Sequence, residues 1–169
     1  MSVWIEKDKH QRRPDIIDPQ IKIAANYTSP MMAKWKARKN GYDEIILTDN
    51  EGYVAEGPTS NVFMVSQDGV LMTAQEDEVL HGITRMSIIE IAEDEGIEMK
   101  IGRIPLKELQ EAIEVFITSS SHLICPVNSL DGKPVGSGKI GEKTLIIKNR
   151  FLNVVSGKDK KFSKWLWPV

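Results

Sequence analysis

The order of apolar and polar residues along the chain predicts short strands that alternate with helices. Runs of apolar residues bounded by turn residues predict strands at residues 44–49, 53–56, 61–66, 70–73, 97–101, 114–118 and 123–130. Apolar residues at helical spacing predict helices at residues 31–39, 83–95, 105–112 and 142–155. Turn residues between the first four strands pair them into two hairpins. The pattern is therefore that of a mixed α and β protein.

The beginning of the chain has a different pattern. Residues 1–20 mix charged residues with Pro14 and Pro19, which predicts an extended approach segment rather than a core element. Pro30 suits the first position of the helix that follows, and Thr28 or Ser29 would cap it. We therefore expect a linker over residues 1–18 and one domain over residues 19–169.

Composition and charge narrow the classes of function. The 169 residues include 22 basic and 24 acidic ones and carry a net charge of -2, so we expect neither nucleic acid nor membrane as a partner. A single cysteine, Cys125, allows no internal disulfide, and the N-terminus has no signal-peptide core, which favours the cytoplasm. The scattered histidines predict no metal site.

Lys22 is the first candidate for chemistry. It is the only charged residue of the run Ile21-Lys22-Ile23-Ala24-Ala25-Asn26-Tyr27. In apolar surroundings the ammonium form loses hydration, so the neutral amine that attacks an aldehyde cofactor becomes accessible. The alternative is an ordinary solvated lysine.

Three further motifs suit the same kind of cofactor. Glu56 ends a strand and would pair with a cofactor's ring nitrogen, or it is a solvated turn residue. Gly82-Ile83-Thr84 opens a helix whose free N–H groups favour a phosphate, or Thr84 simply caps that helix. Ser119-Ser120-Ser121 follows a buried strand and offers further donors, or it is an ordinary loop.

The order of the motifs resembles that of the class IV aminotransferases, the fold type IV enzymes that use pyridoxal 5'-phosphate. The matching motifs are Lys22 with Asn26-Tyr27, Gly41-Tyr42-Asp43-Glu44, Glu56-Gly57 with Asn61-Val62-Phe63, Gly82-Ile83-Thr84-Arg85, Glu114-Val115-Phe116 with Ser119-Ser120, Pro126-Val127, and Gly138-Lys139-Ile140-Gly141. The resemblance implies an α+β fold like that of D-amino acid aminotransferases. In that fold a mixed β-sheet is partly curled into a pseudo-barrel with flanking helices.

The resemblance also implies a role for each site residue. Lys22 is the Schiff-base lysine and proton shuttle, Glu56 the partner of the ring nitrogen, and Tyr27 a donor to the phenolic oxygen. The phosphate is held by Ile83, Thr84, Ser119 and Ser120. Arg85 fixes the phosphate-binding helix, and Ser121 and His122 are predicted to contact the substrate, although His122 is alternatively a surface residue.

Lys22 with Asn26-Tyr27 resembles branched-chain amino acid aminotransferases, so we expect transamination of branched-chain amino acids with 2-oxoglutarate. D-amino acid aminotransferases and aminodeoxychorismate lyases are the alternatives within the family, and a non-catalytic assembly protein is the alternative outside it. Family members carry a smaller domain before this lysine, and we expect it to be absent here. The chain would then be a fragment, half of a split enzyme or a remnant, completed by that domain or by a homodimer. Arg12 and Arg13 fall in the linker, and we give them no phosphate role.

Overall fold

The computed structural model describes residues 1–7 and 11–167. Its strands are β1 (Ser2–Glu6), β2 (Glu44–Leu47), β3 (Asn61–Val65), β4 (Leu71–Thr73), β5 (Met99–Ile101), β6 (Glu114–Ser119), β7 (Leu123–Val127), β8 (Ser129–Leu130) and β9 (Lys133–Pro134). Its helices are α1 (Ala25–Lys39), α2 (Ile83–Asp94), α3 (Leu106–Gln110) and α4 (Glu142–Val155), with 3₁₀ turns η1 (Glu76–Glu78) and η2 (Ser163–Trp165). The strands and helices predicted after residue 40 are present with shifted ends, with two exceptions. Of the strand predicted at residues 53–56, Tyr53 and Val54 form only isolated bridges, and the strand predicted at residues 123–130 is divided into β7 and β8, which belong to different sheets.

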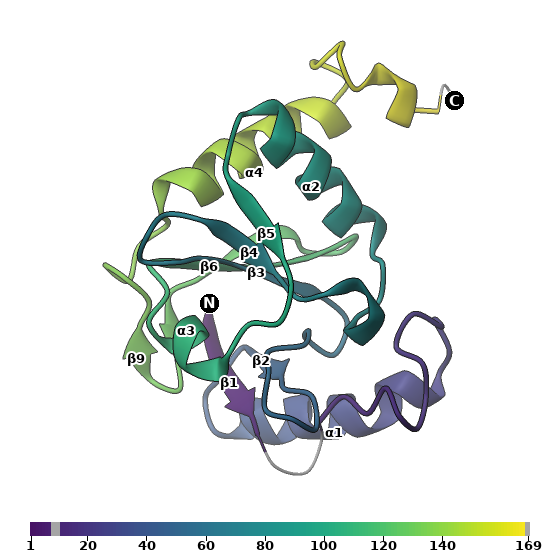
Figure 1. Cartoon of the computed structure of the whole chain (residues 1–169), viewed down its shortest axis with the longest axis vertical. Helices are drawn as coiled ribbons and strands as arrows, with labels where there is room; N and C mark the ends of the chain where they lie inside the picture. The colour runs from purple at the N-terminus through teal and green to yellow at the C-terminus, as the bar shows by residue number, and fades with distance from the viewer. Residues whose placement is uncertain (8–10, 168–169) are drawn as a thin grey trace.

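The elements form four layers (Figure 1). Helices α2 and α4 cover one face of a five-stranded sheet with the order β5-β4-β3-β6-β7. The other face of that sheet packs on a four-stranded sheet with the order β2-β1-β8-β9, and α1 covers the far side of β2. The predicted mixed sheet with flanking helices is confirmed, with its strands divided between two sheets that each contain parallel and antiparallel pairs.

Strand β3 shows how the sequence builds the centre of the fold. All of its residues are buried because both faces of the sheet are covered. Successive side chains point to opposite faces, so Val62 and Met64 join the core between the sheets, whereas Phe63 and Val65 join the core under the helices. The unbroken apolar run Val62–Val65 is therefore what a central strand requires.

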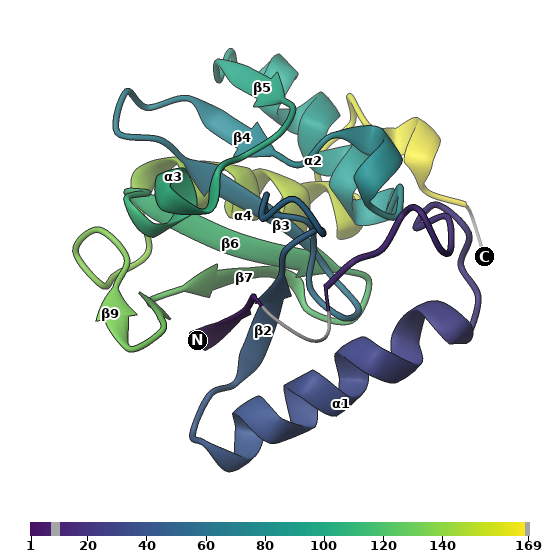
Figure 2. The same ribbon diagram turned by 60° about the horizontal axis from the view of Figure 1, so that its bottom comes forward.

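The expectation that residues 1–20 supply no core element is wrong for β1. Val3 and Ile5 are fully buried between the sheets, and β1 pairs in parallel with both β2 and β8. In Figure 2 this strand, next to the mark of the N-terminus, lies beside β2. Burial alternates along Ser2, Val3, Trp4 and Ile5, but the sequence does not show this alternation, because Trp4 is apolar and charged residues follow Ile5.

Helix α1 begins earlier than predicted, at Ala25, so Pro30 lies inside the helix. Proline has no N–H, which leaves the carbonyl of Asn26, four residues earlier, without its helical donor. The guanidinium of Arg12 donates to that carbonyl at 2.6 Å. A tertiary contact therefore replaces the lost hydrogen bond, and it places Asn26 and Tyr27 on the first turn of the helix.

The start of α4 is held by a residue from another strand. The buried carboxylate of Glu114 on β6 accepts hydrogen bonds from the N–H groups of Lys143 and Thr144, at 3.1 and 2.7 Å. A Cβ atom at Gly141 would lie 2.0 Å from the Glu114 side chain, so this position needs glycine for the close approach. Among the described helices, none is long and apolar enough to cross a membrane.

Candidate active site

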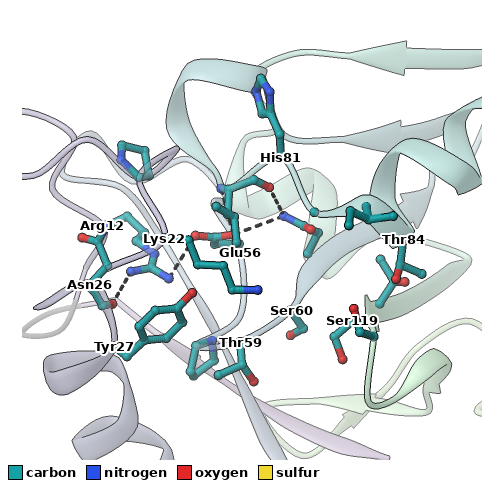
Figure 3. A pocket seen from close by; sticks show the side chains of 18 of the residues that line it. Arg12, Lys22, Asn26, Tyr27, Glu56, Thr59, Ser60, His81, Thr84 and Ser119 are labelled. Atoms are coloured by element: carbon teal, nitrogen blue, oxygen red, sulfur yellow. Dashed lines mark hydrogen bonds and ion pairs between the residues drawn. The ribbon is translucent and has the colours of Figure 1, made fainter. Parts of the chain in front are cut away.

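A cavity of about 380 Å³ lies where four segments meet, and Figure 3 shows its side chains. These segments are the approach to α1, the loop from Glu56 to Asn61, the start of α2 and the end of β6. Every residue predicted to bind the cofactor lines this cavity, namely Lys22, Tyr27, Glu56, Ile83, Thr84, Ser119 and Ser120. These predicted residues lie up to 98 positions apart in the sequence, from Lys22 to Ser120.

Glu56 is the most buried ionisable group of the cavity wall, with 3% of its surface exposed. One carboxylate oxygen pairs with Arg12 at 2.9 Å, and the other accepts from the Asn61 amide at 3.1 Å and from the Leu80 N–H at 3.2 Å. Burial raises the pKa of Glu56 to about 7, and the nearby Arg12 charge opposes this shift. The solvated-turn alternative is therefore wrong, because this carboxylate is desolvated and held in place.

Arg12 is a functional candidate that the sequence did not reveal. It was placed in a linker, but its side chain is buried and joins Glu56 to the Asn26 carbonyl, as Figure 3 shows. It therefore ties the carboxylate of the cavity to the first turn of α1. No local pattern predicts this contact, since Glu56 lies 44 residues further along the chain.

Lys22 reaches the cavity, but its surroundings differ from the prediction. The side chain is exposed, and the flanking Ile21 and Ile23 are 51% and 41% exposed, so the apolar setting inferred from the sequence is absent in this chain. Figure 3 shows the Lys22 amine extending into the same space that the Tyr27 hydroxyl faces. Tyr27 is half-buried on the first turn of α1. The amine is accessible to a ligand because the cavity is open on this side.

The start of α2 presents unpaired N–H groups to the cavity. Gly82 precedes the helix, and no side chain caps it, so the alternative in which Thr84 serves as the cap is wrong. Thr84 is buried, Ile83 is 75% exposed, and both residues line the cavity. Free N–H groups and the helix dipole at such a position favour a phosphate group.

The buried side chain of Arg85 fixes the start of α2 to a neighbouring segment. It is 1% exposed and donates to the carbonyl of Ala74 at 2.9 Å, which ties α2 to the segment after β4. Burial lowers the pKa of Arg85, and the nearby carboxylates of Glu76 and Glu56 oppose that shift. The predicted helix-fixing role is compatible with this contact.

The serine run after β6 splits between the cavity and an exposed turn. Ser119 and Ser120 line the cavity, but Ser121 and His122 do not, and both are exposed. The hydroxyl of Ser119 lies 3.1 Å from His122 Nδ1 and 3.1 Å from the Ser121 hydroxyl. The two residues predicted to contact substrate therefore lie outside the cavity, next to Ser119 of its wall, and their role stays a prediction. The described residues include no group of three or more His, Cys, Asp or Glu side chains placed to hold a metal ion.

Comparison with known proteins gives the family. Residues 3–130 match the family described as amino-transferase class IV. The chain is 34% identical over 170 residues to a probable branched-chain-amino-acid aminotransferase of Aquifex aeolicus, covering 100% of this chain and 53% of that protein. It is 37% identical over 155 residues to the branched-chain-amino-acid aminotransferase of Escherichia coli, covering 91% of this chain and 49% of that protein. The chain belongs to the class IV aminotransferase family, and it spans about half the length of these relatives.

Solved structures lead to the same family. A branched-chain aminotransferase from the archaeon Thermoproteus uzoniensis, with norvaline, has a TM-score of 0.92 and 34% identity, over 99% of this chain and 55% of that one. The branched-chain amino acid aminotransferase of Thermobaculum terrenum, in its PLP form, has a TM-score of 0.93 and 31% identity, over 99% and 54%. The fold is therefore the fold type IV architecture that the motifs implied.

Proposed function

We propose that this chain is the pyridoxal phosphate-binding part of an aminotransferase that acts on branched-chain amino acids and 2-oxoglutarate. The observation that carries the proposal is one cavity lined by an accessible lysine, a buried carboxylate and an uncapped helix start. The names of the relatives at 34% and 37% identity support the choice of substrate class.

The residues of the cavity fit the chemical groups of this cofactor. The primary amine of Lys22 suits the aldehyde, and the buried carboxylate of Glu56 suits a protonated ring nitrogen. The free N–H groups at the start of α2, with Ser119 and Ser120, suit the phosphate, and the Tyr27 hydroxyl suits the phenolic oxygen. The donors and acceptors therefore match a ligand with an aldehyde, a basic nitrogen and a phosphate.

Bound pyridoxal phosphate supplies an electron sink for the bond that breaks at the substrate Cα. The carboxylate of Glu56 would hold the proton on the ring nitrogen, and the ion pair with Arg12 keeps that carboxylate in place. The free amine of Lys22 would take the proton from the substrate Cα as a general base and would return it, as a general acid, to the cofactor carbon that carried the aldehyde. The Tyr27 hydroxyl would donate a hydrogen bond to the phenolic oxygen and so orient the cofactor.

The proposal also covers the contacts with the substrate, the cellular location and the assembly of the enzyme. Ser121 and His122 lie outside the cavity beside Ser119, and from there they would contact the carboxylate of the substrate. We place the working enzyme in the cytoplasm as a homodimer, and the remaining half of the relatives' length would complete the substrate pocket.

An absorption spectrum of the purified chain with added pyridoxal phosphate tests the proposal. We expect a visible band from covalent attachment that is absent in Lys22→Ala and present in Lys107→Ala, a control on α3 whose side chain is 83% exposed. Titration with L-leucine, D-alanine and L-glutamate then tests the substrate class, with loss of the band expected for leucine and glutamate only. A band that survives in Lys22→Ala contradicts the assignment. A response to D-alanine alone contradicts the branched-chain class.

A further inference from the structure

Asn61 joins two parts of the cavity that bind opposite ends of the proposed ligand. It is the first residue of β3, it is 5% exposed, and no role has been assigned to it so far. Its side chain lies on the same face of the sheet as Phe63, which is the face covered by α2. From there it reaches both Glu56 and the segment that leads into α2.

Both hydrogens of the Asn61 amide nitrogen are used. One is donated to the Glu56 carboxylate at 3.1 Å, and the other to the carbonyl of Leu80 at 2.8 Å. The N–H of Leu80 donates to the same Glu56 oxygen at 3.2 Å, which closes a ring of three residues. The position of Glu56 is therefore fixed relative to Leu80 in two ways, directly by the Leu80 N–H and indirectly through the Asn61 amide.

The same amide also contacts the start of α2. The N–H of Gly82 donates to the Leu80 carbonyl at 2.8 Å, so one carbonyl accepts from both Asn61 and Gly82. A Cβ atom built on Gly82 would lie 2.4 Å from Oδ1 of Asn61. Gly82 has an ordinary φ of -64°, so the approach of Asn61, and not the backbone conformation, requires glycine here.

We propose that Asn61 is a positioning residue that holds the carboxylate of Glu56 and the phosphate-binding start of α2 at a fixed separation. The inference rests on the proposed function, since it concerns the distance between the acid for the ring nitrogen and the cradle for the phosphate. In this proposal Asn61 acts on the phosphate site through Leu80 and Gly82. Without the Asn61 amide, the Leu80 carbonyl and the Glu56 carboxylate each lose one hydrogen-bond donor.

The test compares affinities for pyridoxal phosphate, for pyridoxal, which lacks the phosphate, and for inorganic phosphate measured by competition. The variants are Asn61→Ala, Asn61→Asp, which keeps the shape but removes both donors, and Gly82→Ala, which pushes on Asn61 from the other side. The control is Asn153→Ala, an exposed asparagine of α4. Each variant is first shown to be folded by circular dichroism and thermal unfolding.

We expect all three variants to bind pyridoxal phosphate about tenfold more weakly, the scale set by one lost buried hydrogen bond. The affinity for inorganic phosphate is expected to fall as well, because Asn61 acts on the start of α2 through Leu80 and Gly82. The carboxyl carbon of Glu56, followed by NMR in the unliganded chain, is expected to titrate at higher pH in Asn61→Ala, because a donor to the charged form is lost.

The outcomes separate the two proposals. If the unaltered chain binds no pyridoxal phosphate, the proposed function fails. If the unaltered chain binds it and folded Asn61 and Gly82 variants retain full affinity for inorganic phosphate, the positioning role of Asn61 is wrong. A lower affinity for pyridoxal with an unchanged affinity for inorganic phosphate also overturns the positioning role, since Asn61 would then act on Glu56 only.

Discussion

The substitution Glu56→Gln gives a prediction whose size follows from the structure. The pKa of Glu56 rises from an ordinary value of 4.5 to about 7 because the carboxyl group is buried. The folded chain therefore holds this proton more tightly than the unfolded chain does. The stabilisation of the folded chain by this proton is complete below pH 4.5 and is lost as the pH rises through about 7.

A shift from 4.5 to about 7 corresponds to about 3 kcal/mol of unfolding free energy, of which about 2 to 3 kcal/mol is lost between pH 5 and pH 8. The assay is urea unfolding of the wild type and Glu56→Gln at these two pH values. Other carboxyl groups titrate in both proteins, so the difference between the two pH slopes isolates Glu56. The glutamine does not titrate, and its slope should lack this loss. Parallel slopes in the two proteins would refute the raised pKa and the desolvation that causes it.

Three further predictions concern the contacts around the site. Arg12→Met leaves the Glu56 carboxylate buried without its partner and should cost about 3 kcal/mol in urea unfolding, and adding Glu56→Gln should recover most of that loss. Gly141→Ala should displace Glu114 from the start of α4 and cost about 1 to 2 kcal/mol in the same assay, and an unchanged stability would contradict that contact. Ser120→Ala should weaken pyridoxal phosphate more than pyridoxal in equilibrium binding, whereas equal weakening would remove Ser120 from the phosphate site.

Most elements after residue 40 were predictable because local signals agree with the fold. The hairpin of β3 and β4 follows from apolar runs on either side of Gln67-Asp68-Gly69, and Gly69 has the positive φ of 84° that such a turn needs. Helix α2 follows from helical spacing between Gly82 and Gly96. In these places propensity, turn chemistry and burial all favour the same structure.

The predictions that failed depend on distant contacts. A proline near residue 30 indicates a helix start locally, but the guanidinium of Arg12 satisfies the Asn26 carbonyl and lets α1 begin five residues earlier. The isoleucines beside Lys22 suggested an apolar setting, yet hydrophobic residue type does not fix exposure, and both are largely exposed. The buried pair of Arg12 with Glu56 has no counterpart in any local pattern.

The most direct test of the central claim is to locate the residue to which pyridoxal phosphate attaches. The purified chain is mixed with pyridoxal phosphate, reduced with borohydride to make the attachment permanent, digested and analysed by mass spectrometry. Our account predicts one modified peptide, carrying the label on Lys22, and no saturable label in Lys22→Ala. Labelling spread over exposed lysines such as Lys107, or equal labelling of the wild type and Lys22→Ala, would contradict the account.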